Sequence, residues 1–128
     1  MDELRSDISA LINSGILLYY PSQLKISLPI IDRIYRKITL DKEVIFPDVK
    51  LYDDIIVDGH HTYIAHALAN KSISTIPWAK SSTTIKNEWK YVKFVEEDFD
   101  SVHEIKEHNK RDATYLDMSL EDFLDKLK

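Results

Sequence analysis

The residues best suited to chemistry stand together in one short run, Asp58-Gly59-His60-His61-Thr62. A helix that begins after Gly59 would leave its first backbone N–H groups free, with the positive end of the helix dipole behind them. Such a helix start binds anions, and phosphate above all. The imidazoles can donate to phosphate or move protons, the Thr62 hydroxyl can add a donor, and Asp58 can hold a divalent cation or a substrate hydroxyl. We therefore expect an anion-binding turn here.

Glycine usage supports a geometric role for this turn. The chain has 2 glycines in 128 residues, against an average near 7%, and one of them is Gly59. Only glycine adopts a positive φ, or lets another group approach the backbone closely, at little cost. A tight turn with Asp58 as a helix cap and with packed histidines explains the same residues, so both interpretations stay open at this point.

The elements around the turn are predicted by periodicity and by turn residues. Ile55-Ile56-Val57 is typical of a buried strand, and residues 60–70 read as an Ala-rich helix ending at Asn70. Because Pro47 separates two strand-like runs, one of them should be an edge or be broken. The other predicted helices cover residues 2–14, 29–38, 100–111 and a segment capped by Ser119, and the other predicted strands cover residues 15–21, 24–28, 42–46, 49–53, 74–80 and 89–95. This order predicts one mixed α/β domain over residues 1–128.

The run Asp58-Gly59-His60-His61, after a β-branched strand and before an Ala-rich helix, resembles the DGHHR motif of the ParB/sulfiredoxin-like superfamily. The likeness covers roughly residues 24–80, including the preceding helix, the polar turn and the "IP" strand that follow. It implies a mixed sheet flanked by helices. Residues 94–128 lie outside the likeness, and their charge and helix patterns predict an acidic helical extension.

The resemblance also implies a site. Nucleotide diphosphate or triphosphate would bind at the helix start, with Mg²⁺ as a candidate companion. Gly59, His60 and His61 would line the phosphates, and Asp58 would face the reacting group or hold the metal. The chain departs from the family at Thr62, which stands where the motif has Arg and lacks the bidentate phosphate grip of a guanidinium.

Two activities of the superfamily are excluded because the chain lacks residues or domains that they need. The sulfiredoxin reaction needs a catalytic cysteine, which is absent. A partition protein needs a longer basic motif with two arginines and then a helix-turn-helix DNA-binding domain; neither is visible, and 128 residues are too few for both. A phosphotransferase similar to the free serine kinase, or a nucleotide hydrolase, would use Asp58, His60 and His61 as catalytic candidates. A metal-dependent nuclease is a less natural fit, because adjacent histidines on a helix point about 100° apart. An acceptor-orienting carboxylate would come from just upstream, where nothing singles out one of Glu43, Asp48, Asp53 and Asp54.

Charge and composition narrow the function classes further. The absence of cysteine excludes disulfides and thiol catalysis and fits a reducing cytoplasm. No apolar run approaches the roughly 18 residues of a membrane span. Net charge is −5, and residues 94–128 carry 11 acidic against 5 basic side chains. Duplex nucleic acid is a poor partner for such a chain, because affinity for it comes mainly from phosphate neutralisation.

A second hypothesis belongs to a different class: a non-catalytic interaction protein, such as an antitoxin, an immunity protein or a sensing module. The acidic residues 94–128 would then contact a protein partner. His66, His103 and His108 are interpreted as surface residues. Aromatic side chains are favoured at interfaces, and their alternative role is core packing. The candidates for such a contact surface are Trp78, Trp89, Tyr91 and Phe94.

Overall fold

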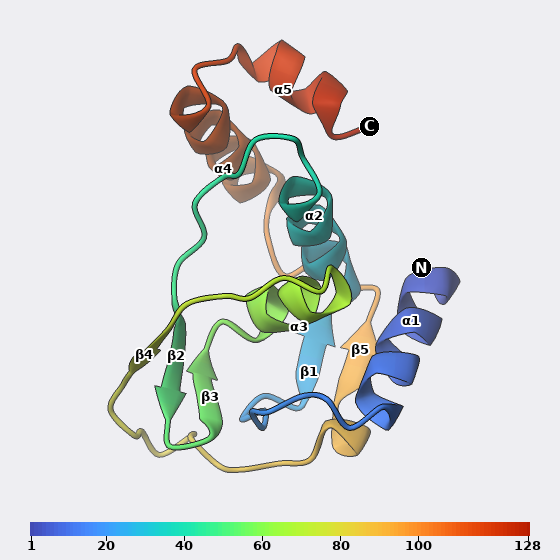
Figure 1. Ribbon diagram of the computed structural model, residues 1–128, viewed down its shortest axis with the longest axis vertical. Helices are drawn as coiled ribbons and strands as arrows, with labels where there is room; N and C mark the ends of the chain where they lie inside the picture. Colours follow the sequence, from blue (N-terminus) through green and yellow to red (C-terminus); the bar gives the residue numbers. More distant parts are fainter.

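Strand β2 (Val49–Tyr52) is the centre of a three-stranded sheet in the computed structural model, which describes residues 1–128 (Figure 1). It pairs antiparallel with β3 (Ile55–Asp58) and parallel with β4 (Thr75–Pro77). A tight turn joins β2 to β3, and Asp53 takes a positive φ of 51° there. Ile56 is fully buried, as its β-branched run predicts.

A second sheet joins segments that are far apart in the sequence. β1 (Lys25–Ser27) pairs in parallel with β5 (Lys93–Val95). The prediction of a strand over residues 89–95 is confirmed only for its end, because Trp89–Tyr91 forms a 3₁₀ turn, η1. The fold is therefore a mixed α/β domain with two small sheets and five α-helices.

Helices α1 (Asp2–Asn13), α2 (Leu28–Ile38) and α3 (His60–Leu68) have the predicted boundaries to within a few residues. Pro29 lies in the first turn of α2, where its missing N–H costs nothing. Asn70 takes a positive φ of 54° after α3, as its C-terminal role predicts. No α-helix of the chain is long and apolar enough to cross a membrane.

These three helices and both sheets share one apolar core, which we call the body core. It keeps the first turn of α3 between β1 and β3, so that residues from three elements meet there (Figure 1). The buried members are Ile8, Ile26, Leu28, Ile31, Ile38, Val49, Ile56, Tyr63, Ile64, Ala65, Trp89 and Val92.

Two predicted strands are wrong. Residues 15–21 run beside β3 but make a single bridge, in which Tyr20 N–H donates to Asp54 O and Ile56 N–H donates to Tyr20 O, both at 2.8 Å. Residues 42–46 form a loop, and Val44 packs against the C-terminal helices. Apolar and β-branched composition reports burial as much as strand pairing, and tertiary packing decides between them.

The last two helices, α4 (Val102–Tyr115) and α5 (Leu120–Lys126), form a C-terminal hairpin beyond the end of α2 (Figure 1). The N-terminus of α4 has a reciprocal capping box between Ser101 and Glu104. Ser119 caps α5 by accepting from Asp122 N–H, which confirms the predicted cap. The polar helix predicted over residues 100–111 is four residues longer at its C-terminal end.

Candidate functional site

Gly59 is the residue on which the turn depends. Its φ is +101°, a conformation that side chains disfavour. A Cβ added there would lie 3.3 Å from both Cα and Cγ2 of Val49. The geometric role that glycine scarcity predicts is therefore present, and the close approach is to strand β2.

The first turn of α3 is open in the sense that no side-chain hydrogen bond caps it. Tyr63 N–H bonds to Gly59 O at 2.9 Å. The N–H groups of His60, His61 and Thr62 therefore have no partner within the helix, and the dipole adds partial positive charge to them. Asp58 does not act as the cap. Its side chain is 74% exposed, 3.8 Å from Lys50 Nζ.

His60 is buried and faces the backbone of another segment. Its Nε2 accepts from Ser22 N–H at 3.0 Å and from Gln23 N–H at 3.3 Å, so this nitrogen carries a lone pair. Burial, with a smaller contribution from the neighbouring His61, lowers the pKa of His60 to about 4. The imidazole is therefore neutral near pH 7 and holds residues 22–23 against α3.

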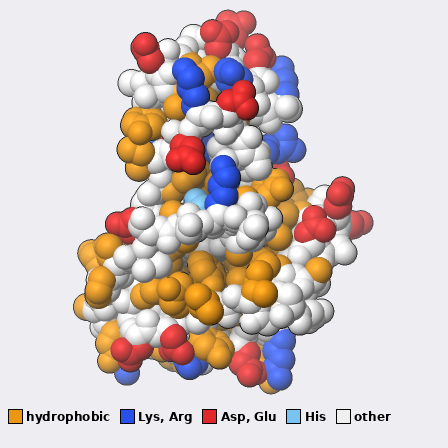
Figure 2. Space-filling model, in the orientation of Figure 1, with side chains coloured by type: hydrophobic (Ala, Val, Ile, Leu, Met, Phe, Trp, Pro, Cys, Tyr) orange, Lys and Arg blue, Asp and Glu red, His pale blue; other side chains and the backbone are white.

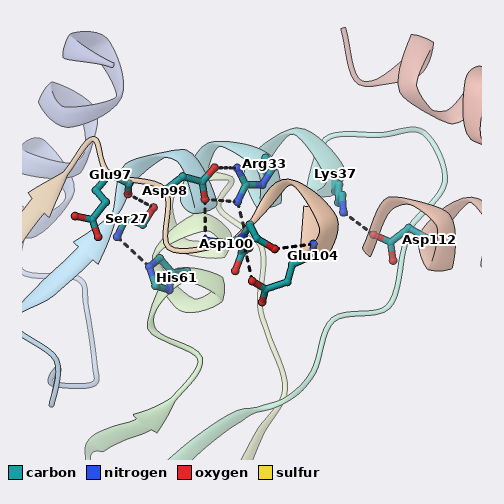
Figure 3. Close-up of polar contacts among 10 residues, drawn as sticks. Ser27, Arg33, Lys37, His61, Glu97, Asp98, Asp100, Glu104 and Asp112 are labelled. Carbon is teal, nitrogen blue, oxygen red and sulfur yellow. Dashed lines mark hydrogen bonds and ion pairs between the residues drawn. The ribbon is translucent and has the colours of Figure 1, made fainter. Parts of the chain in front are cut away.

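His61 makes the same kind of contact one residue further on. Its Nε2 accepts from Ser27 N–H at 3.0 Å (Figure 3). The Phe99 ring packs edge-on against it, with ring centroids 5.9 Å apart. Burial lowers the pKa of His61, an effect that Asp100 opposes. We call His60 and His61, with the three backbone N–H groups they accept from, the histidine clamp.

The clamp restricts what the histidines can do chemically. Both Nε2 atoms already accept from backbone groups, so neither is free to take a proton from a substrate. The neighbouring serines are not activated either. Ser22 Oγ donates to Ile56 O at 2.6 Å, and Ser27 Oγ donates to Glu97 O at 2.7 Å. The geometry therefore supports a positioning role for both imidazoles.

Carboxylates surround the clamp on its α2 side. Arg33 lies between Asp98, at 2.5 Å, and Asp100, at 3.1 Å, and Figure 3 shows this group beside His61. The hydrogen bond to Asp98 raises the pKa of Arg33, and the same bond lowers the pKa of Asp98. One guanidinium thus serves two carboxylates on this side of the turn.

Two of the upstream carboxylates lie away from the turn. Asp53 and Asp54 occupy the β2–β3 turn, at the opposite end of β3 from Asp58, and Asp54 pairs with Lys86 at 2.8 Å. Asp48 is exposed and directly precedes Val49, which packs against Gly59. No group of three or more His, Cys, Asp or Glu side chains converges to hold a metal ion. A cation at Asp58 would therefore need most of its ligands from elsewhere.

Residues that sequence reasoning missed complete the site. Ser22, Gln23 and Ser27 come from the segment before α2, and the Arg33 cluster joins α2 to residues 98–100. No local pattern signals these partners, because each pairs with a residue more than 30 positions away.

One expectation outside the turn is wrong. His66 is buried, its Nδ1 donating to Thr62 O at 2.7 Å, and the edge of the Phe46 ring packs against it. Of the four aromatic candidates for a contact surface, Trp89 takes the alternative role of core packing, and its Nε1 donates to Tyr19 O at 2.9 Å. Trp78 and Tyr91 are 47% and 63% exposed.

Comparison with known proteins assigns no family or function to the chain. No family model, no curated protein and no solved structure matches the chain.

Proposed function

We propose that this chain is a ParB/sulfiredoxin-like domain that binds the phosphates of a nucleotide at the first turn of α3. The observation that carries the proposal is the open helix start. The N–H groups of His60, His61 and Thr62 have no cap, and Gly59 supplies the sharp turn before them. Phosphate is the anion that such a helix start binds best.

The phosphates would contact the backbone and the Thr62 hydroxyl. The imidazoles would not contact the phosphates themselves; they would position the turn, because the histidine clamp holds residues 22–27 against α3. A turn that is already rigid loses little conformational entropy when it binds a ligand. The sequence-based expectation that the histidines line the phosphates is therefore revised to one in which they position the turn.

The charge around the turn favours a nucleotide complexed with Mg²⁺ over a bare polyphosphate. Asp100 and Asp58 act on His61 electrostatically, and Arg33 opposes them, so Mg²⁺ would reduce the repulsion between the two carboxylates and the phosphates. Since the chain brings no metal-ligand group together, the phosphates would supply most of the ligands to the cation, as is usual for Mg²⁺. We also propose a cytoplasmic location, where such complexes are available.

Thermal unfolding with a ligand panel tests the proposal. ATP, ADP, CTP, GTP and pyrophosphate would be added to the full chain, each with and without Mg²⁺. A ligand at 100 times its dissociation constant adds about 2.7 kcal/mol to a native state that alone binds it. We expect one nucleotide with Mg²⁺ to raise the unfolding temperature.

Substitutions at Thr62 separate binding from folding. Thr62→Glu places a carboxylate at the helix start, where it stabilises the helix dipole but competes with phosphate. We expect this variant to be as stable as wild type or more so, and to lose the ligand effect. Thr62→Arg restores the residue of the motif and should strengthen binding, with Thr62→Gln as the uncharged control. A panel in which no ligand shifts any of the four proteins would refute nucleotide binding.

Turnover would rest on Asp58, the exposed carboxylate of the turn, because both clamp Nε2 atoms are occupied. If the domain transfers or hydrolyses phosphate, Asp58→Asn should abolish phosphate release while the nucleotide still shifts the unfolding temperature. If the Asp58→Asn variant still releases phosphate, a residue other than Asp58 acts as the catalytic base.

A further inference from the structure

An open groove runs between α1 on one side and α2 and α3 on the other, with a volume of about 670 Å³. It lies near the C-terminal end of α3. His60 is eight residues earlier on that helix, about 12 Å along the axis, so the groove is separate from the nucleotide turn. Its apolar lining consists of Leu4, Ala10, Leu11, Ile16, Tyr35, Ala67 and Leu68.

The charged side chains of the groove are all acidic. Glu3, Asp7 and Asp32 line it, and no Lys or Arg does. Asp32 is paired with Arg36 at 3.0 Å, whereas neither Glu3 nor Asp7 makes an ion pair. Figure 2 shows acidic side chains gathered over α1. Two uncompensated carboxylates thus border an apolar floor.

Apolar surface continues beyond the groove across α3. Ile16 and Ala67 also line a neighbouring cleft that contains Leu18. Ile16 is 60% exposed and Leu18 is 73% exposed. On the face of the body shown in Figure 2, apolar side chains gather below the level of α3. The neighbouring cleft also contains Lys71, so only the groove itself is bordered by acidic side chains alone. A continuous exposed apolar patch rimmed by polar residues marks an interaction site.

We propose that this groove binds an amphipathic helix of a partner protein that carries basic residues beside its apolar face. The length of α1, 12 residues, is about 18 Å and matches three turns of a docked helix. Helices dock in this way by laying an apolar face into an apolar groove. Glu3 and Asp7 select the basic partner, because like charges across an interface are repelled and opposite charges speed association.

Designed peptides test the proposal on the full chain. The probes are a 14-residue Leu/Lys amphipathic helix, its Leu/Glu counterpart, and a Leu/Lys peptide of the same composition in an order that is not amphipathic. Binding would be followed by fluorescence anisotropy at physiological ionic strength. We expect the Leu/Lys helix to bind at least about ten-fold more tightly than either other peptide, a difference of about 1.4 kcal/mol.

Matched variants place the binding in the groove. Glu3→Lys/Asp7→Lys should weaken the Leu/Lys helix at least about ten-fold and improve binding of the Leu/Glu helix. Glu121→Lys/Asp125→Lys changes net charge equally, on exposed carboxylates with the same spacing on α5, and should change affinity less than about two-fold. Leu11→Asp should weaken binding, and Leu24→Asp, at an exposed position outside the groove, should not. Circular dichroism would check that each variant folds.

Three results would overturn the proposal. Equal weakening by the α1 and α5 charge reversals would show that net charge alone attracts the peptide. No binding of the Leu/Lys helix at about 1 mM would place the affinity outside the range of specific complexes. A wild-type dimer in sedimentation equilibrium that Leu11→Asp dissociates would make a second copy of the chain the occupant. Nucleotide binding at Thr62 is independent of all three results.

Discussion

The body core buries twelve apolar side chains in one cluster, whereas the cluster between the body and the C-terminal hairpin buries only three. A buried ion pair and a hydrogen bond from Arg36 to Leu127 O, at 3.3 Å, also join the hairpin to the body. The smaller cluster consists of Val44, Ala113 and Phe123. The ion pair joins Lys37 of α2 to Asp112 of α4 at 2.7 Å, and the two side chains are 9% and 4% exposed. The two regions therefore depend on different interactions.

We therefore expect the stability of the two regions to respond differently to the same kind of substitution. Apolar burial is non-directional and tolerates repacking. A buried ion pair depends on both partners, because removing one leaves an uncompensated charge away from water. The nucleotide turn belongs to the body, so it should keep its geometry while the hairpin opens locally.

Breaking the ion pair should have the largest effect. Lys37→Ala removes the closer cation from the buried Asp112 and leaves it only Arg111, at 3.5 Å. It should destabilise the hairpin by up to about 3–5 kcal/mol. Hydrogen exchange should become faster in α4 and α5 and stay slow in α3. Lys37→Met/Asp112→Leu removes both charges and should recover most of the loss. If α3 exchanged as fast as α4 in Lys37→Ala, the two regions would be one cooperative unit.

Truncating one core side chain in each region compares the two clusters directly. Ile64→Ala should lower the free energy of unfolding by about 2–5 kcal/mol, and Phe123→Ala should cost a similar amount if the cavity that it leaves does not collapse. Amide hydrogen exchange at positions 64 and 123, measured at increasing urea concentration, would report the stability of the two regions separately. We expect Ile64→Ala to weaken protection everywhere and Phe123→Ala to weaken it only in the hairpin.

Acid should act on the body through the histidine clamp. The folded-state pKa of His60 is about 4, below the ordinary value near 6.5, so the unfolded chain binds more protons between these two values. The stabilisation is fully present above pH 6.5 and is lost as pH falls toward 4. Because one pKa unit corresponds to about 1.36 kcal/mol, the loss is roughly 3 kcal/mol.

The matched variant for this pH dependence is His60→Gln, which keeps an acceptor but does not titrate. Chemical denaturation at several pH values should give a flatter stability profile for the variant than for wild type. If the stability of His60→Gln falls with pH as steeply as that of wild type, the acid sensitivity belongs to other groups. His61 and His66 are among them, because burial also lowers their pKa values.

The smallest expected effect is at the nucleotide turn itself. Thr62→Glu should raise the free energy of unfolding by about 0.3–1 kcal/mol, because a carboxylate near the N-terminus of a helix interacts favourably with the dipole. Glu107→Gln, an exposed change on α4 of the hairpin, serves as the surface control and should stay within about 0.5 kcal/mol of wild type. Destabilisation by Thr62→Glu would mean that the helix start is not open to an anion.

Local units of the fold were predictable because each depends on its own residues. The β-branched run at residues 55–57, Gly59 and the Ala-rich helix after it specify a strand, a turn and a helix through backbone preferences. Ser119 caps α5 through a neighbour three residues away. The strand predicted over residues 42–46 failed because Val44 is buried by distant helices, which no local pattern records.

That a glycine turn with two histidines precedes a helix could be predicted from residues 55–70 alone. Long-range packing is what brings both imidazoles to backbone N–H groups 34 to 38 positions earlier. It also brings Lys37 to Asp112, 75 positions away. The physical reason is that an imidazole or a charged side chain has several possible partners. Long-range packing selects one by burying it, and burial makes an unpaired polar group costly.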